Sequence, residues 1–291
     1  MVVTPTMRTT CGSLLVALSV LSAQAECLAA KDFARVALAG GSITETVYFL
    51  GLQHRIVAVD STSLYPEDAK SLPNMGYVRA LSAEGVLSLN PTLVIGENDM
   101  GPPYVLQQIE RTNVELVRID EENSALGILR KVECIASVLG QAEKGGDRIS
   151  SDLMPLAERL AEIGEQVEIR PAAAFILSMG DGTAMAGGNS TSADGFLRMA
   201  FTQNSFVSFD GWKPVSAESL LNASPEFLVI APMDQDLTDT AEQLRGLDAI
   251  RDLPAVQNRK YVIVESMASL GFGPRTLSTA VSVAEAIHGP P

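Results

Sequence analysis

Tyr77 and Arg79 stand two residues apart in the stretch Gly76-Tyr77-Val78-Arg79, and both side chains can take part in coordination chemistry. In an extended segment, residues i and i+2 point to the same side, so we expect the guanidinium of Arg79 to approach the phenol oxygen of Tyr77. A neighbouring cation or a bound ferric ion favours the phenolate and lowers the phenol pKa below about 10. A phenolate is a hard anionic ligand of the kind that binds ferric iron. The competing interpretation is a half-buried loop aromatic beside a solvated cation.

Two glutamates occupy matching places in a repeated pattern. The string Ser82-Ala83-Glu84 precedes an apolar helix face, a proline and an apolar strand, and Ser216-Ala217-Glu218 precedes the same succession. The helix dipole favours an acid in the first turn by about 0.3–1 kcal/mol, which is a sufficient reason for either residue. The duplication also predicts one exposed acid on each of two similar lobes, which would suit a partner with two basic patches. On the duplication alone, both interpretations stay open.

Catalytic chemistry finds little support in the sequence. The chain has two histidines, His54 and His288, and neither has a nucleophile or acid partner suggested by its neighbours. No nucleophile elbow, phosphate loop or dinucleotide fingerprint is present. The glycine-rich turn from Gly187 could hold an anion at a helix N-terminus, although the chemistry of a tight turn accounts for it equally well. An enzyme is therefore the weaker hypothesis.

The elements that must position these residues alternate between strands and helices. We expect strands at residues 35–39, 56–60, 93–95 and 114–119, separated by helical periods. Continuous apolar runs of this kind indicate a parallel sheet covered on both faces. A long polar segment from Ser61 to Arg79 interrupts the pattern, and loops of that length are usually functional.

The alternation starts again after a long helical stretch. Residues 124–168 read as helix, and we expect a connecting helix that ends near Arg170. Strands at 172–177, 227–230 and 261–264 then alternate with helices at 191–199, 239–250 and 274–288, which indicates a second α/β lobe. Tyr77, the turn at Met179 and the loop 267–274 all follow strands, so they can face one cleft. The predicted fold class is α/β, with two α/β lobes joined by a single long helix: an N-terminal lobe at 26–140, the connecting helix at 141–170 and a C-terminal lobe at 171–291.

The N-terminus has the pattern of a secretory signal peptide. Arg8 precedes an apolar run and a small-residue site at Ser22-Ala23-Gln24-Ala25, so we predict cleavage after Ala25 and a periplasmic protein. A lipid anchor on Cys27 is the alternative, although Glu26 stands where a small residue belongs. The formal net charge of −14 repels nucleic acid and suits a soluble carrier that meets a basic partner.

Two cysteines remain after cleavage. Cys27 would lie in a frayed N-terminus and Cys134 on a helical face, so we expect no structural disulfide. Two cysteines also cannot make a zinc site of the usual four ligands.

The most distinctive string of the chain is Gly76-Tyr77-Val78-Arg79-Ala80-Leu81-Ser82-Ala83-Glu84-Gly85, and residues 40–45, 60–63, 101–103 and 267–273 add to it. On these residues, nearly the whole mature chain resembles the periplasmic haem-binding proteins of bacterial haem-uptake ABC transporters. The two-lobed framework of these class III binding proteins is shared with siderophore-binding and cobalamin-binding proteins.

The resemblance implies that ferric haem b lies between the lobes with Tyr77 as its axial iron ligand and Arg79 bonded to the ligand oxygen. Some members use a histidine of the second lobe as a further ligand, and this chain has Met179 at that place. A thioether is a weak, soft partner for ferric iron, so we favour packing of Met179 on the porphyrin over coordination. Phe272 and Arg275 are expected at the porphyrin edge and at a propionate, respectively.

By the same resemblance, Glu84 and Glu218 would dock to arginines of a membrane permease dimer. The leading hypothesis is thus a monomeric, non-enzymatic haem carrier of an inner-membrane ABC importer. A ferric-siderophore or cobalamin carrier of the same fold is the alternative, and a secreted α/β enzyme is the third hypothesis.

Overall fold

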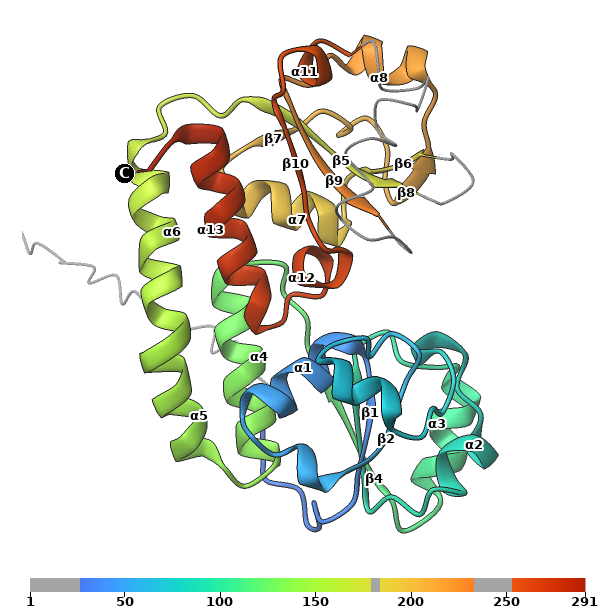
Figure 1. Ribbon diagram of the computed structural model, residues 1–291. Helices are drawn as coiled ribbons and strands as arrows, with labels where there is room; N and C mark the ends of the chain where they lie inside the picture. The colour runs from blue at the N-terminus through green and yellow to red at the C-terminus, as the bar shows by residue number, and fades with distance from the viewer. Residues whose placement is uncertain (1–26, 179–183, 233–252, 291) are drawn as a thin grey trace, which may run out of the picture.

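The computed structural model describes residues 27–178, 184–232 and 253–290 of the 291-residue chain. These residues form two α/β lobes joined along one side by a column of helices (Figure 1). The predicted fold class is confirmed. The predicted signal peptide, Met179 and the helix expected at 239–250 lie outside the described residues.

The N-terminal lobe is built on a parallel sheet with the strand order β2-β1-β3-β4. Its central strand β1 is buried at all its positions, as expected for a parallel sheet with helices on both faces. The strands are β1 (Val36–Ala39), β2 (Ile56–Val59), β3 (Leu93–Glu97) and β4 (Glu115–Ile119). The helices are α1 (Gly41–Phe49), α2 (Ala83–Leu87) and α3 (Pro103–Glu110), with short 3-10 turns η1 (Gln53–Arg55), η2 (Glu67–Ser71) and η3 (Val78–Ala80).

The C-terminal lobe has a mixed sheet in the order β10-β9-β5-β6-β8. Strands β10, β9 and β5 are parallel, whereas β6 and β8 are antiparallel to their neighbours, and the short β7 pairs with β5. The strands are β5 (Ala172–Ser178), β6 (Ala184–Gly187), β7 (Gln203–Asn204), β8 (Trp212–Pro214), β9 (Phe227–Pro232) and β10 (Tyr261–Ile263). The described helices are α7 (Ser192–Met199), α8 (Ala217–Ala223), α11 (Pro254–Gln257) and α12 (Ser266–Leu270).

Two local predictions in this lobe need correction. The region expected to be only a glycine-rich turn contains β6, in which Ala186 lies opposite Ile176 of β5. The segment expected as a loop from Met267 contains the short helix α12. The side chain of Glu265 caps the N-terminus of this helix by accepting two main-chain hydrogen bonds.

The column consists of α4 (Ala125–Val138), α5 (Ala142–Arg148), the π-helical turn η4 (Ile149–Leu153), α6 (Met154–Gln166) and α13 (Pro274–His288). Helices α5, η4 and α6 follow one another without a break and form the predicted crossover. The closing helix α13 lies beside α6 (Figure 1), and Arg159 Nη2 on α6 is 2.8 Å from Glu285 Oε1 on α13. The crossover is therefore reinforced by the last helix of the chain. The boundaries at residues 140 and 170 remain our interpretation.

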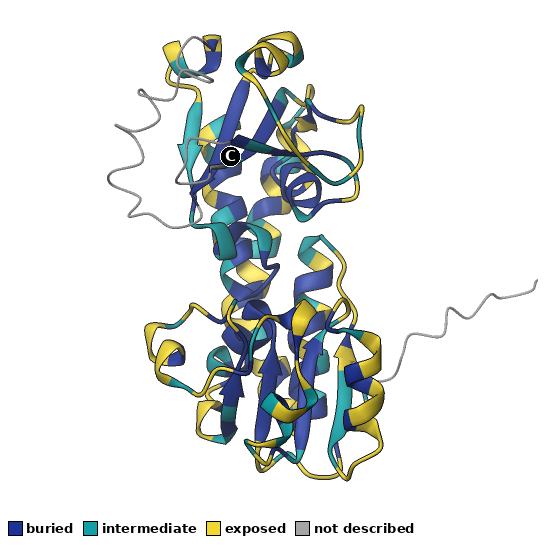
Figure 2. Cartoon of the chain, turned by 90° about the vertical axis from the view of Figure 1, so that its right-hand side faces the viewer, coloured by how far each residue is buried: buried dark blue, intermediate teal, exposed yellow. Residues whose placement is uncertain are grey.

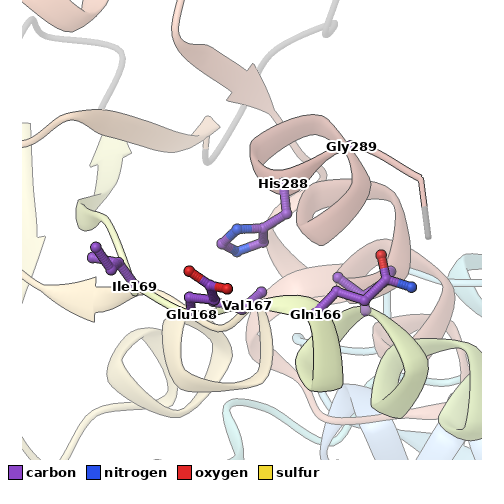
Figure 3. Close-up of a pocket in the computed structure, with 7 residues that line it drawn as sticks. Gln166, Val167, Glu168, Ile169, His288 and Gly289 are labelled. Carbon is purple, nitrogen blue, oxygen red and sulfur yellow. The ribbon is translucent and has the colours of Figure 1, made fainter.

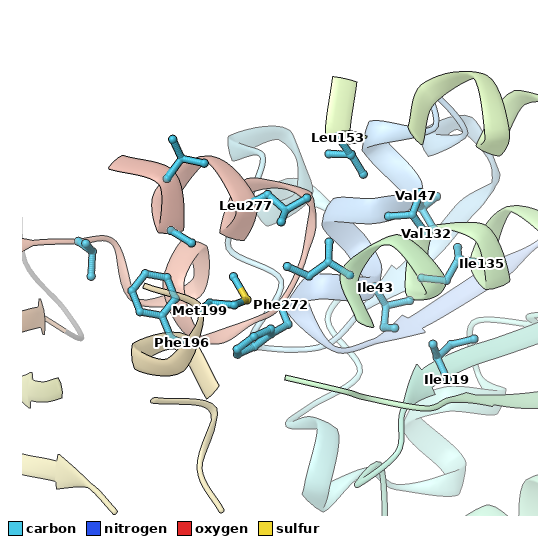
Figure 4. Close-up of a cluster of buried hydrophobic side chains, with 14 of the residues drawn as sticks. Ile43, Val47, Ile119, Val132, Ile135, Leu153, Phe196, Met199, Phe272 and Leu277 are labelled. Atoms are coloured by element: carbon cyan, nitrogen blue, oxygen red, sulfur yellow. The ribbon is translucent and has the colours of Figure 1, made fainter. Parts of the chain in front are cut away.

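The largest buried cluster spans both lobes. The cluster joins Ile43 of the first lobe and Val132 of the helical column to Phe196 of the second lobe. Phe272 and Leu277 lie between them (Figure 4). Figure 2 shows the same division from the side, with buried strands inside each lobe and exposed residues on its outer helices. Because the lobes share a core at the column, their relative motion there would expose apolar surface, which costs about 25 cal/mol per Å².

Cys27 and Cys134 form a disulfide with a Cα–Cα distance of 5.1 Å. The prediction of no structural disulfide is therefore wrong. The segment after Cys27 is not frayed, because the amide of Ala30 donates to the carbonyl oxygen of Val138 at 2.9 Å and Ala30 is 5% exposed. This contact brings the start of the described chain against α4.

Candidate functional site

The carboxyl ends of the parallel strands in the two lobes face each other. In the first lobe, α1 follows β1, and Glu121 follows β4. In the second lobe, α12 follows β10, and the carbonyl oxygen of Gly271 just beyond it accepts a hydrogen bond from Lys131 on α4 at 3.2 Å. Lys131 also contacts Glu121. The strand ends thus meet at the column, and ligands of open α/β sheets bind beyond such ends.

Tyr77 lies at this end of the first sheet, in a loop held by main-chain bonds to β2. The amide of Ser61 donates to the carbonyl oxygen of Gly76 at 2.8 Å, and Asn74 pairs with Val59. Gly76 has a φ of +100°, a conformation that favours glycine. The Tyr77 side chain that follows is 43% exposed, and its hydroxyl makes no hydrogen bond within the described residues. The phenol oxygen is therefore accessible to a ligand.

Arg79 is bound to Asp99 and not to the Tyr77 phenol. Its Nε and Nη2 atoms lie 2.6 and 2.5 Å from Asp99 Oδ2. Burial alone would lower the pKa of Arg79. The hydrogen bond and charge of Asp99, together with the charges of Tyr77 and Glu97, outweigh this effect, so the pKa of Arg79 is raised. The expected direct bond between the guanidinium and the phenol is thus replaced by an ion pair. We call Tyr77, Arg79 and Asp99 the tyrosine edge.

Asp99 was not identified from the sequence. It lies just beyond the end of β3, and the position of an acid after the carboxyl end of a parallel strand is the signal that could have found it. The loop that contains it is fixed to the tyrosine loop, because Gly101 N donates to Val78 O and Leu81 N donates to Gly101 O, both at 2.9 Å.

Arg275, expected at a haem propionate, lies in a different environment. Its Nε is 2.8 Å from Glu45 Oε2 on α1, and its Nη1 is 3.0 Å from Glu265 Oε2. The guanidinium also stacks on the ring of Tyr65, 3.5 Å from its centroid. The ion pair to Glu45 joins the second lobe to the first. Nη2 of Arg275 is buried and has no hydrogen-bond partner among the described residues, and a propionate at Arg275 stays a prediction.

Phe272 is fully buried and belongs to the core shared by the lobes. Its expected place at a porphyrin edge is corrected, since a side chain with no exposed surface cannot contact a ligand in this conformation. The residue has a φ of +50° between two glycines, and this turn directs the ring inward at the start of α13 (Figure 4).

Lys131 is the second cation that the lobes share, with a side chain only 1% exposed. Besides Glu121 and Gly271 O, its Nζ bonds Ser42 Oγ at 3.1 Å, and Ser42 Oγ donates to Glu97 Oε1 at 2.9 Å. Burial and the charge of Glu121 raise the pKa of Glu97 to about 7, against the opposing charge of Lys131 and the bond from Ser42. Lys131 stands at helical spacing with Ile128 and Ile135, so its buried face could have been recognised from the sequence.

We call the contacts of Lys131 and Arg275 the interlobe seam. The lobes approach closely at this seam, because a Cβ atom on Gly41 of α1 would lie 2.6 Å from Met267 Cε on α12. Glycine at position 41 is required mainly by its own lobe, because a Cβ atom there would lie 2.5 Å from the main-chain carbonyl oxygen of Thr62.

A model of the periplasmic binding protein family matches residues 36–267. The chain belongs to this family. It is similar to the periplasmic heme-binding protein RhuT from Roseiflexus sp. RS-1 in apo form, at 30% identity and a TM-score of 0.77 over 88% of this chain and 98% of that one. It is also similar to the periplasmic heme-binding protein BhuT in complex with two hemes, at 30% identity and a TM-score of 0.76 over 87% and 98% of the chains.

A vitamin B12-binding protein from Pectobacterium carotovorum subsp. carotovorum (strain PC1) is 24% identical over 190 residues, which cover 64% of this chain and 67% of that protein. As a periplasmic binding protein of an ABC uptake system, the chain is a substrate carrier and not an enzyme.

In this binding protein, Glu84 and Glu218 occupy matching helix starts. Ser82 caps α2 by accepting a hydrogen bond from Gly85 N at 3.0 Å, and Ser216 caps α8 by accepting one from Ser219 N at 3.2 Å. Each glutamate lies in the first turn of its helix and is exposed. The predicted duplication of a capped helix with an acid, one in each lobe, is confirmed in its geometry.

Other candidate sites are weaker. His288 Nε2 donates a hydrogen bond to the carbonyl oxygen of Ala200 at 3.1 Å. It borders an open pocket of about 210 Å³ between the C-terminal ends of α6 and α13 (Figure 3), lined by Ile163, Gln166, Val167, Glu168, Ile169, His288 and Gly289. Ligand pockets usually have about 300–1,000 Å³, so this pocket is small for a ligand.

No cluster of histidine, cysteine and acidic residues within the described ranges could hold a metal ion. Among the same residues, no helix combines the length and the hydropathy that crossing a bilayer requires.

Proposed function

We propose that this periplasmic binding protein carries ferric haem b and delivers it to the permease of an inner-membrane ABC importer. The observation that carries the proposal is the accessible Tyr77 phenol beside Arg79, at the strand ends that face the second lobe. The heme-binding names of the similar structures RhuT and BhuT support it.

The residues present fit this cargo. Ferric iron prefers a hard anionic oxygen, and Tyr77 supplies one once its proton leaves. Arg79 favours that loss, because a nearby cation stabilises the phenolate. One anionic ligand without an opposing imidazole leaves the cargo releasable, which a carrier requires. In this proposal Met179 packs on the porphyrin and does not coordinate its iron.

The test is a titration of the purified protein with hemin, cyanocobalamin and a ferric siderophore in parallel. We expect hemin alone to bind, with the absorption spectrum of a five-coordinate, high-spin ferric haem with a tyrosinate ligand. Cobalamin carriage is the alternative that the vitamin B12-binding relative favours. Binding of cyanocobalamin or the siderophore without a Soret change for hemin would establish that alternative.

We further propose that Glu84 and Glu218 dock the carrier to basic residues of the permease dimer. Both side chains are exposed and make no ion pair within the described residues. We expect Glu84→Lys and Glu218→Lys to reduce uptake in cells while hemin affinity stays unchanged, since neither residue belongs to the tyrosine edge. Exposed Glu143 provides the matched control as Glu143→Lys. Uptake at the level of the control would contradict the docking role.

Periplasmic localisation completes the proposal. Disulfides persist in oxidising compartments such as the periplasm, and the Cys27–Cys134 bond therefore supports export. A sulfur atom in this bond cannot also carry a lipid, so we expect a soluble mature chain that starts at Glu26. Mass spectrometry of the exported protein should find that N-terminus and the disulfide. A diacylated Cys27 would contradict it.

A further inference from the structure

The Arg79–Asp99 ion pair has a geometry that fixes which part of the guanidinium remains available. Asp99 takes the Nε and Nη2 hydrogens through a single oxygen, Oδ2. Within the described residues, Nη1 of Arg79 makes no hydrogen bond, and neither does the Tyr77 hydroxyl. One donor edge of the cation is thus occupied, while the other stays available in the neighbourhood of an accessible phenol.

Stability does not explain this arrangement. The side chains of Arg79 and Asp99 are 61% and 44% exposed, and pairs that exposed contribute about 0–1 kcal/mol. The pair is nevertheless well anchored, because the main-chain bonds of Gly101 to Val78 and Leu81 tie the loop of Asp99 to the loop of Arg79. Asp99 therefore holds the guanidinium in one place without adding appreciably to the free energy of unfolding.

We propose that Asp99 is a positioning residue for the iron ligand: it holds Arg79 by one edge, leaves Nη1 for the ligand oxygen of Tyr77, and balances the charge of the cation. This inference rests on the proposed haem function. The iron–porphyrin core carries one positive charge in the ferric state and none in the ferrous state. With Asp99, the tyrosine edge carries one net negative charge when Tyr77 is a phenolate, so it balances ferric and not ferrous haem.

Removal of the Asp99 charge should change the redox behaviour of the bound haem. In the haem complex, the loss of one negative charge should raise the midpoint potential of the iron. Hemin affinity should remain within about tenfold, because the ligand itself is retained.

The experiment compares the protein, Asp99→Asn and a control. Asp152→Asn is matched, since Asp152 forms an Arg–Asp pair of 2.6 Å with Arg148 on the helical column, with side chains 40% and 41% exposed. The potential is read by spectroelectrochemistry of the hemin complexes.

A raised potential of the hemin complex in Asp99→Asn, with no change in Asp152→Asn, is the expected result. Equal potentials of the two variants, in proteins that bind hemin, would overturn the role of Asp99. Failure of the unaltered protein to bind hemin would instead overturn the proposed function, and the two failures are therefore distinguishable.

Discussion

Two arginines in this protein each lie near a tyrosine and acidic groups, yet their environments differ. Arg275 in the interlobe seam bonds two carboxylates and stacks on Tyr65, and its partner Glu45 has a side chain only 6% exposed. Arg79 at the tyrosine edge bonds one carboxylate, and the phenol of Tyr77 has no partner among the described residues. A mostly buried cation that bonds carboxylates of both lobes holds the fold, whereas an exposed cation with a free donor near an accessible oxygen can serve a ligand.

Loss of the seam arginine should have the largest effect on stability. Arg275→Ala leaves the carboxylate of Glu45 buried without its partner, so we expect a loss of about 3 kcal/mol in the free energy of unfolding. Arg79→Ala removes an exposed pair and should cost less than about 1 kcal/mol. Denaturant unfolding of both variants provides the comparison. Equal losses would show that the seam does not hold the lobes together.

The seam should also make stability depend on pH. The pKa of Glu97 is raised from 4.5 to about 7, and burial also raises the pKa of Glu45. Between these values the folded protein binds more protons than the unfolded chain, so stability falls as the pH rises from about 4.5 to 7. The contribution of Glu97 is on the order of 3 kcal/mol.

Glu97→Gln tests this dependence, because glutamine keeps the acceptor for Ser42 without the charge. We expect the variant to be more stable than the unaltered protein at pH 8 and to lose part of the decline between pH 5 and pH 8. Glu143→Gln, at an exposed position, is the control. A decline of unchanged size in Glu97→Gln would exclude Glu97 as its source.

The sequence predicts most of the framework because the signals for it are local. Strand β1 and the closing helix α13 follow from hydrophobic periodicity, and their observed bounds differ from the predicted ones by one residue at most. The accessible loop of Tyr77 follows equally from its length and its glycine.

The misses depend on contacts between distant parts of the chain. Cys27 and Cys134 are separated by 107 positions, and the hydrogen bonds that bring them together have no local pattern. The ring of Phe272 turns inward only because the other lobe supplies a core for it. Asp99 pairs with Arg79 across 20 positions because the main-chain bonds of Gly101 join their loops.

The most direct test of the account is hemin binding by Tyr77→Phe, which removes one oxygen atom and preserves the ring. Tyr104→Phe is the matched control, since Tyr104 is a 64% exposed tyrosine of the same lobe. We expect Tyr77→Phe to lose the tyrosinate-type spectrum and at least about a hundredfold in hemin affinity, which corresponds to roughly 2.7 kcal/mol, while Tyr104→Phe retains both. An unchanged spectrum and affinity in Tyr77→Phe would contradict the account.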